Sequence, residues 1–485
     1  MSEKISDSDK ADLHRNLPLL EGLGLSAEAR GLLAAHARAS KFARIGREEL
    51  RILAAGLCQT TPVTKRAVEE LIGSGLWSEA PLKGISGRPK VGYIGSARLR
   101  GLVDGKTSYP LGALVDHVLQ PSNQLASIHA SERVETAQLS PVERKRQYRI
   151  QLKKKAAGAT RWLLAVLLAH ADRWGIVKGL GSAKLAELTG LNQERLKAHL
   201  FKLRELGLIS HQLPGFSGWP LLSKWGTVYF LNLHHPDLRE AYPASTVVVM
   251  DARGGRRVPN RTEAGLIIGR AVVESGERFV WTHAELIFLG QPVDSHDGDD
   301  DLARYFVLQR RGRQEMVTAA LQFALDQMAS QLLSTRWHSL EQLEVDGELR
   351  KLVRGLLKVA KGHEVPMGRI ELMLARVAIA QACRIKRWLE PFVWLSLNDY
   401  QYDYQLLPIA NIDVGWDGGM RCVLVRPKRG KPRPGIFDNH EDAERWHIML
   451  EPEKYPWQGS PLLSVPRPLT RYGRSTSQST HMASG

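Results

Sequence analysis

Residues 181–209 read GSAKLAELTGLNQERLKAHLFKLRELGLI and carry the strongest structural pattern in the chain. Ser182 is a good N-cap residue, so a short helix is expected to start there. Gly190 supplies the backbone freedom that a tight turn needs after this helix. Asn192 is then expected to cap a longer second helix. The stretch therefore predicts two short helices joined by a turn.

The second helix carries its apolar residues at helical spacing. Three leucines fall at i, i+4 and i+7 and are expected to form one buried stripe: Leu196, Leu200 and Leu203. Gly207 suits the position that ends such a helix. Strands at 208–209 and 227–233 are expected to form a hairpin across a Gly- and Pro-rich loop. A helix at 162–174 would complete the core.

This arrangement, within residues 156–235, resembles the winged helix-turn-helix family. The resemblance implies that the second helix enters the DNA major groove, with residues near its start reaching base edges. Four polar residues that point away from the leucine stripe are the implied base contacts: Asn192, Gln193, Arg195 and Lys197. Lys202 lies farther along and is expected to contact phosphate. Winged helices also dock proteins, and that alternative stays open.

The expected wing departs from the family pattern. Residues 211–226 hold only His211 and Lys224 as candidate cations, whereas a wing that enters the minor groove usually carries more Arg or Lys. Contact between this wing and DNA is therefore left open.

A second, weaker match lies in residues 26–118. A helix is expected at 48–57, and a helix at 65–73 ends in glycine and leucine like the one above. A Gly-rich loop begins at residue 83. Residues 26–118 as a whole resemble a second winged helix. The alternative is a small helical domain with a basic loop. The cations expected to contact DNA here are Lys65, Arg66, Lys83, Arg88 and Lys90.

Residues 119–155 are interpreted as a linker with a basic run. Its cations are expected to contact phosphate: Arg144, Lys145, Arg146, Lys153, Lys154 and Lys155. Two tethered winged helices would read a longer site, because the second binds at a high effective concentration. This arrangement is similar, in architecture alone, to plasmid-type replication initiators.

The C-terminal range 245–427 is expected to be mostly helical. Helical periodicity covers three segments: 302–333, 340–360 and 367–392. Alternating apolar residues then flank Asp417-Gly418-Gly419, a pattern typical of a β-hairpin whose first strand includes Ile409, Ile412 and Val414. Tyr400, Tyr402 and Tyr404 alternate and would share one face of a strand. Packing against helices is favoured for them over stacking on single-stranded bases. Residues 428–485 read as a loose basic tail.

The composition points to a polyanionic partner. The chain has 67 Lys and Arg against 51 Asp and Glu, a formal net charge of +16. Its three cysteines are far apart, which argues against a cysteine zinc site or a disulfide framework. No apolar run approaches the length of about 20 residues that spans a bilayer, and no apolar signal core is found at the start. We expect a cytoplasmic, nucleoid-associated protein that does not enter the membrane.

The combined prediction is a mainly α fold with small β-wings, in which tandem winged helix-turn-helix domains precede a C-terminal helical domain that ends in a β-hairpin. The expected function is sequence-selective binding of double-stranded DNA, as a transcriptional regulator or as a replication or maintenance factor of a mobile element. The C-terminal domain is a candidate dimerisation domain, so a homodimer is among the expected partners. No catalytic motif, cofactor site or metal site is predicted.

Two rival hypotheses remain open. A nuclease or primase could have its site in the C-terminal third, where Asp297, Asp299 and Asp301 would bind Mg²⁺, although an exposed solvated loop is favoured for this acidic segment. A scaffold would use its winged helices to dock proteins.

Overall fold

The fold was analysed in a computed structural model. It describes residues 23–40, 42–57, 59–82, 90–99, 110–120, 158–217, 224–233, 235–239, 247–250, 263–267, 289–291, 314–357, 367–390, 402–407 and 422–427. This described part is mainly helical and carries small antiparallel sheets, which confirms the coarse fold class. None of the helices described combines the length and the apolar character needed to cross a membrane.

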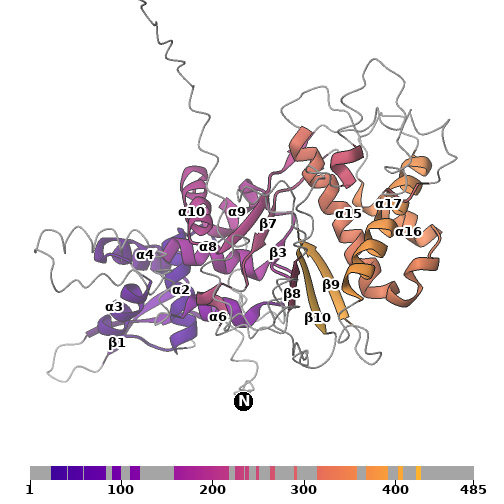
Figure 1. The fold of residues 1–485 in the computed structure, drawn as a ribbon. Coiled ribbons are helices and arrows are strands. Elements are labelled where there is room, and N and C mark those ends of the chain that lie inside the picture. Colours follow the sequence, from indigo (N-terminus) through magenta and orange to yellow (C-terminus); the bar gives the residue numbers. More distant parts are fainter. Residues whose placement is uncertain are drawn as a thin grey trace, which may run out of the picture.

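The N-terminal unit, indigo in Figure 1, consists of helices followed by a small antiparallel sheet. Its elements are α2 (Ala27–Ser40), α3 (Arg47–Gly56), α4 (Thr61–Gly73), β1 (Trp77–Leu82) and β2 (Lys90–Gly95). Pro62 lies in the first turn of α4, where a missing N–H removes no helical hydrogen bond. Ile45 forms an antiparallel bridge with Tyr93 on the other edge of β2, so three chain segments lie side by side in the order Ile45, β2, β1.

The central unit repeats this plan around a longer sheet. Its elements are α6 (Gly112–Leu119), α8 (Gly158–Ala169), β3 (Ile176–Val177), α9 (Ser182–Thr189), α10 (Gln193–Glu205), β4 (Ile209–Leu213), β7 (Val228–Leu231) and α11 (Pro236–Arg239). The strands are antiparallel and lie in the order β3-β7-β4. A short ribbon of β5 (Phe216–Ser217) and β6 (Lys224–Trp225) lies between β4 and β7 in the sequence.

Two boundaries in this unit differ from the sequence prediction. The helix expected at 162–174 begins earlier, at Gly158, and ends at Ala169, because the chain must turn there to enter β3. Ser182 was expected to cap α9, but it is the first helical residue. Gly181 takes the cap position, and as a glycine it has no side chain that could accept a hydrogen bond from the helix.

Helix α8 is buried on every side. All twelve of its residues are buried, and it packs against α2, α6, α9 and α10. One hydrophobic core runs from Leu25 to Leu238 and contains residues of both units. Gly31 of α2 faces Trp162 of α8, where a Cβ on the glycine would lie 3.9 Å from the Trp162 Cβ. The two ranges expected to be separate winged helices therefore share one core, with α2, α4 and α8 close together in Figure 1.

A buried arginine joins the two units. Arg30 is only 3% exposed, and its Nη1 donates to the Leu188 carbonyl at the end of α9 over 2.8 Å. Its Nε donates to the Leu25 carbonyl over 3.1 Å. Carbonyls at a helix end have no partner within the helix, so the guanidinium of one unit completes the end of a helix in the other.

Two glycines allow the units to approach closely. Gly190, in the turn between α9 and α10, has φ +71°, and a Cβ there would lie 2.1 Å from the Leu25 carbonyl oxygen. Gly158, at the start of α8, would place a Cβ 3.0 Å from the Leu57 carbonyl oxygen. The segment after α9 thus lies against the start of α2, and the segment after α3 lies against the start of α8.

The C-terminal unit, orange in Figure 1, packs helices against a three-stranded sheet. Its helices are α15 (Gln314–Arg336), η7 (Trp337–Gln342, a 3-10 helix), α16 (Gly347–Leu356) and α17 (Met367–Leu389). Its strands are β8 (Val247–Met250), β9 (Tyr402–Leu407) and β10 (Cys422–Pro427), antiparallel in the order β8-β10-β9. These helices lie within the segments whose periodicity predicted them or within a few residues of them.

The second strand of the predicted hairpin is present as β10. Its first strand, expected to include Ile409, Ile412 and Val414, lies outside the described residues. Among the described strands, β10 pairs with β8 and with β9. Tyr402 and Tyr404 of β9 are 8% and 4% exposed, and the Tyr404 ring stacks on Trp337 at 5.0 Å. Packing, the favoured interpretation of these tyrosines, is what the structure shows.

Serine hydroxyls attach β9 to α15. β9 is an edge strand of its sheet, so its outward N–H groups need partners from outside the sheet. The N–H groups of Leu406 and Tyr404 donate to the hydroxyls of Ser330 and Ser334, each over 2.9 Å. This pairing fixes the sheet on the helix.

The central sheet and the C-terminal unit also contact each other. The Phe323 ring of α15 meets Phe230 of β7 at 5.5 Å and Trp225 of β6 at 6.2 Å, both edge to face. Arg173 and Asp403 add an ion pair of 2.8 Å between the two units. The central unit is therefore in direct contact with both of the other units.

The buried arginine gives the first test of this arrangement. Arg30→Met keeps an unbranched apolar stem but leaves the Leu25 and Leu188 carbonyls without their donor. We expect the free energy of unfolding to fall by about 2–3 kcal/mol, since a buried hydrogen bond from a charged group is lost. Urea unfolding followed by circular dichroism measures it.

The matched control is Arg51→Met, because the Arg51 side chain is 78% exposed and pairs only with Glu48 on the same helix. It should change the free energy of unfolding by less than about 0.5 kcal/mol. Equal stability of the two variants would contradict the role assigned to Arg30.

Candidate functional site

Helix α10 is held in place from one side and exposed on the other. Leu196, Leu200 and Leu203 are buried, as the sequence predicted. The Asn192 side-chain oxygen accepts a hydrogen bond from the Arg195 backbone N–H over 2.9 Å, which confirms Asn192 as the N-cap. Gly207 follows the helix with φ +74°, the left-handed conformation expected of it.

The outer face of α10 carries polar residues and one aromatic ring. Gln193 and Lys197 are exposed, whereas Lys202 is half-buried. The Gln193 amide makes only a long 3.5 Å hydrogen bond to the Ser182 carbonyl. Phe201 is 41% exposed, and the Arg204 guanidinium lies 6.0 Å from the centre of its ring. Gln193 and Lys197 are thus the predicted base contacts whose side chains the structure leaves most accessible.

Arg195 has an intramolecular partner that the sequence did not reveal. Its Nη2 forms an ion pair with Glu28 Oε1, and its Nη1 lies 3.5 Å from Glu28 Oε2. Both terminal nitrogens therefore face a carboxylate in the first turn of α2, 167 residues away in sequence. No local pattern could have predicted this pair, because it depends on how the two units pack.

The predicted cations of the N-terminal unit lie on α4. Lys65 and Arg66 are exposed, and Lys65 Nζ lies 3.8 Å from the Glu69 carboxylate. Glu70 on the same helix accepts a 2.9 Å hydrogen bond from the Ser26 backbone N–H. The start of α2 therefore contacts α4 through Ser26 and α10 through Glu28.

Most of the other predicted site residues lie outside the described part of the chain. Lys90 is the first residue of β2. The remaining predicted cations lie outside the described residues: Lys83, Arg88, Arg144, Lys145, Arg146, Lys153, Lys154 and Lys155.

The expected wing faces the C-terminal unit. Phe216 of β5 stacks on Trp225 of β6 at 6.4 Å, and Trp225 in turn meets Phe323 of α15. His211 lies near Phe230, and burial lowers the pKa of its imidazole. Packing on α15 occupies the described base of the wing, which agrees with its low content of cations.

The described part of the C-terminal unit holds buried carboxylates in a hydrogen-bonded network. Gln322 Nε2 donates to Glu263 over 3.0 Å and to Asp326 over 2.9 Å, and Gln381 donates to the same Asp326 oxygen over 2.6 Å. Arg384 pairs with Glu263. Among the described residues, no group of three or more His, Cys, Asp or Glu could hold a metal ion. Asp297, Asp299 and Asp301 lie outside the described residues.

No protein-family model, no curated protein and no solved structure matches this chain.

The capping role of Asn192 yields a test that is independent of any ligand. Asn192→Ala should lower the free energy of unfolding by about 1 kcal/mol, because the Arg195 N–H loses its acceptor. Chemical unfolding measures the change. Asn192→Asp keeps an acceptor oxygen and should retain most of the stability. If the alanine and aspartate variants were equally destabilised, the cap would not explain the loss.

Proposed function

We propose that this protein binds double-stranded DNA through a winged helix-turn-helix formed by residues 158–233. The observation that carries the proposal is the order of the elements: α8, β3, α9, α10, β4 and β7, with the sheet ordered β3-β7-β4. In this plan α10 is the recognition helix, and its outer face is free of the core.

The N-terminal unit supports a tandem arrangement. α2, the Ile45 bridge, α3, α4, β1 and β2 follow in the same order, and the strands align as Ile45, β2, β1. In this unit α4 corresponds to α10. The same plan occurring twice within one chain is more specific than either occurrence alone.

The chemistry of the exposed residues suits a duplex. Gln193 can make a bidentate contact to adenine, and Lys197 can donate to guanine or to phosphate. Lys202, Lys65 and Arg66 would contact phosphate and set the register, with added affinity from the basic run at 144–155. Such a protein would act at the nucleoid as a transcriptional regulator or as a replication or maintenance factor of a mobile element.

A protein-docking function is the second candidate, and one observation favours it. Phe201 is 41% exposed in the middle of the helix that would face DNA. An apolar ring in that position suits a protein partner or a thymine methyl group. The measurement of DNA binding decides between the two.

The deciding experiment is fluorescence anisotropy with a labelled mixed-sequence duplex and the matching single strand, titrated at several salt concentrations. We expect the duplex to bind more tightly, with an affinity that falls steeply with salt as counterions are released. On a duplex obtained by selection for the preferred sequence, the double variant Gln193→Ala, Lys197→Ala should weaken binding about tenfold or more.

Lys351→Ala is the matched control, because this lysine is 71% exposed on α16, outside the proposed interface. It should bind duplex as the wild type does. Absence of duplex binding at low salt would overturn the proposal and would favour the protein-docking function.

Glu28 gives a second prediction about the same interface. The carboxylate occupies both terminal nitrogens of Arg195, the atoms that would make an end-on bidentate contact with guanine. Glu28→Gln should release Arg195 and raise duplex affinity by about three- to tenfold. The same anisotropy titration measures it.

The control is Glu187→Gln, which removes the same charge from α9, where Glu187 pairs with Lys184 over 3.3 Å. It should raise affinity less, because it does not release Arg195. An equal gain in both variants would show that only net charge matters.

A further inference from the structure

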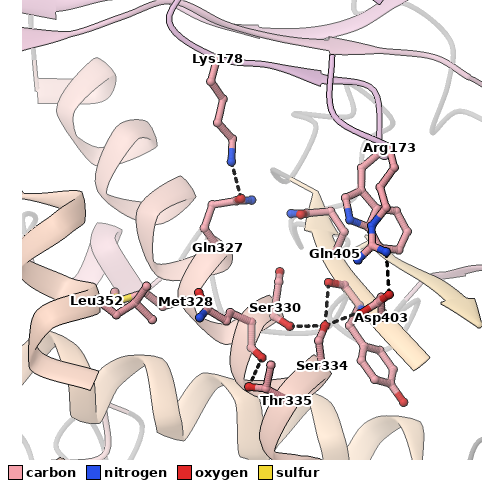
Figure 2. Close-up of a pocket in the computed structure, with 13 residues that line it drawn as sticks. Arg173, Lys178, Gln327, Met328, Ser330, Ser334, Thr335, Leu352, Asp403 and Gln405 are labelled. Atoms are coloured by element: carbon pink, nitrogen blue, oxygen red, sulfur yellow. Dashed lines mark hydrogen bonds and ion pairs between the residues drawn. The ribbon is translucent and has the colours of Figure 1, made fainter. Parts of the chain in front are cut away.

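A polar cleft of about 420 Å³ lies between the central and C-terminal units. One wall is the turn that enters and leaves β3, with Arg173 and Lys178; a second is α15, with Gln327 and Gln331. The edge strand β9 forms the third wall. Figure 2 shows Lys178 reaching from the central unit to Gln327, with Arg173 across the cleft beside Asp403. The volume lies in the range of about 300–1,000 Å³ typical of small-molecule sites.

The two cations of this cleft have different partners. Arg173 and Asp403 neutralise each other in an ion pair of 2.8 Å. Lys178 has neutral partners: its Nζ donates to Gln327 Oε1 over 2.7 Å and lies 5.4 Å from the centre of the Phe323 ring. The described residues place no carboxylate within ion-pair distance of Lys178 Nζ. The ammonium group of Lys178 is therefore not ion-paired, and the Asp172 carboxylate acts on it only at longer range.

The surroundings of Lys178 make a bound anion favourable. Burial lowers the pKa of Lys178, and the nearby Asp172 carboxylate only partly opposes this effect. A desolvated ammonium group gains stability when an anion replaces the water that it has lost. The Gln327 Nε2 is buried and has no hydrogen-bond partner among the described residues. The amide that accepts from Lys178 therefore carries a donor that still needs an acceptor.

The rest of the lining is apolar or neutral. Trp174, Met328 and Leu352 contribute apolar surface, and Gln331 and Thr335 expose polar groups. A ligand that suits both parts has an anionic group at one end and an apolar body. We infer that this cleft binds a small organic anion, with its carboxylate or phosphate group at Lys178 and its body against the apolar side chains of the lining.

This inference does not rest on DNA binding, because every residue that carries it lies outside the proposed DNA interface. A ligand held by Lys178 and Gln327 at once would connect the central unit to α15. Binding should therefore raise the midpoint of thermal unfolding of the full chain, since the ligand favours the folded state.

The test uses three probes of similar shape: benzoate, phenyl phosphate and the neutral benzamide. Ligand-observed NMR titrations on the full chain give the dissociation constants, and thermal unfolding gives an independent measure. We expect at least one anion to bind at least tenfold more tightly than benzamide. Benzoate alone would identify a carboxylate site, and phenyl phosphate alone would identify a phosphate-ester site.

Three variants locate the binding. Lys178→Met removes the charge at nearly constant shape, and Gln331→Glu places a carboxylate on an exposed position of the cleft. Both should weaken anion binding at least tenfold, whereas Lys184→Met, on α9 outside the cleft, should bind as the wild type does. Failure of both anions to bind, equal binding of benzamide, or wild-type binding by Lys178→Met would overturn the inference. Circular dichroism of each variant verifies its fold.

Discussion

The burial of α8 is the constraint on which the rest of the structure depends. A helix that is buried on all sides needs neighbours on all sides, and α9 and α10 cover only part of α8. Helices α2 and α6 cover the remainder. Because α2 belongs to the N-terminal unit, the sequence of α8 requires the two units to be joined. Arg30 and Gly190 make this junction possible. The Arg30 guanidinium donates to a buried carbonyl, and Gly190 has no Cβ that would collide with the Leu25 carbonyl oxygen.

This junction changes how a tandem arrangement would work. Two units on a flexible tether find adjacent sites through a high effective concentration, which depends on linker length. Units that share a core instead hold α4 and α10 at a fixed separation, with the start of α2 between them. The spacing of any two contacts is then set by side-chain packing and not by residues 121–157. Affinity would then depend on whether the two contact sites on the bound molecule are separated by the same distance as α4 and α10.

Local patterns explain what the sequence predicted well. The leucine stripe of α10, its Asn192 cap and the periodicity of α15, α16 and α17 depend on residues a few positions apart, so they can be read directly. The pairing of Glu28 with Arg195 spans 167 residues and depends on the packing of two units, so no periodicity encodes it. The attachment of β9 to α15 is not encoded locally either, because the serines that accept from its N–H groups lie 70 and 76 residues earlier.

The distribution of charge separates the sources of affinity and selectivity. The formal charge of the chain is +16, yet the surface of α4 and α10 carries exposed acids beside its cations: Glu69, Glu70, Glu194 and Glu205. These acids repel phosphates, so this surface alone would attract a polyanion weakly. Most of the attraction would then come from basic segments elsewhere in the chain, such as 144–155. Under this division α10 contributes selectivity, because a nearly neutral face binds well only where its hydrogen bonds are matched.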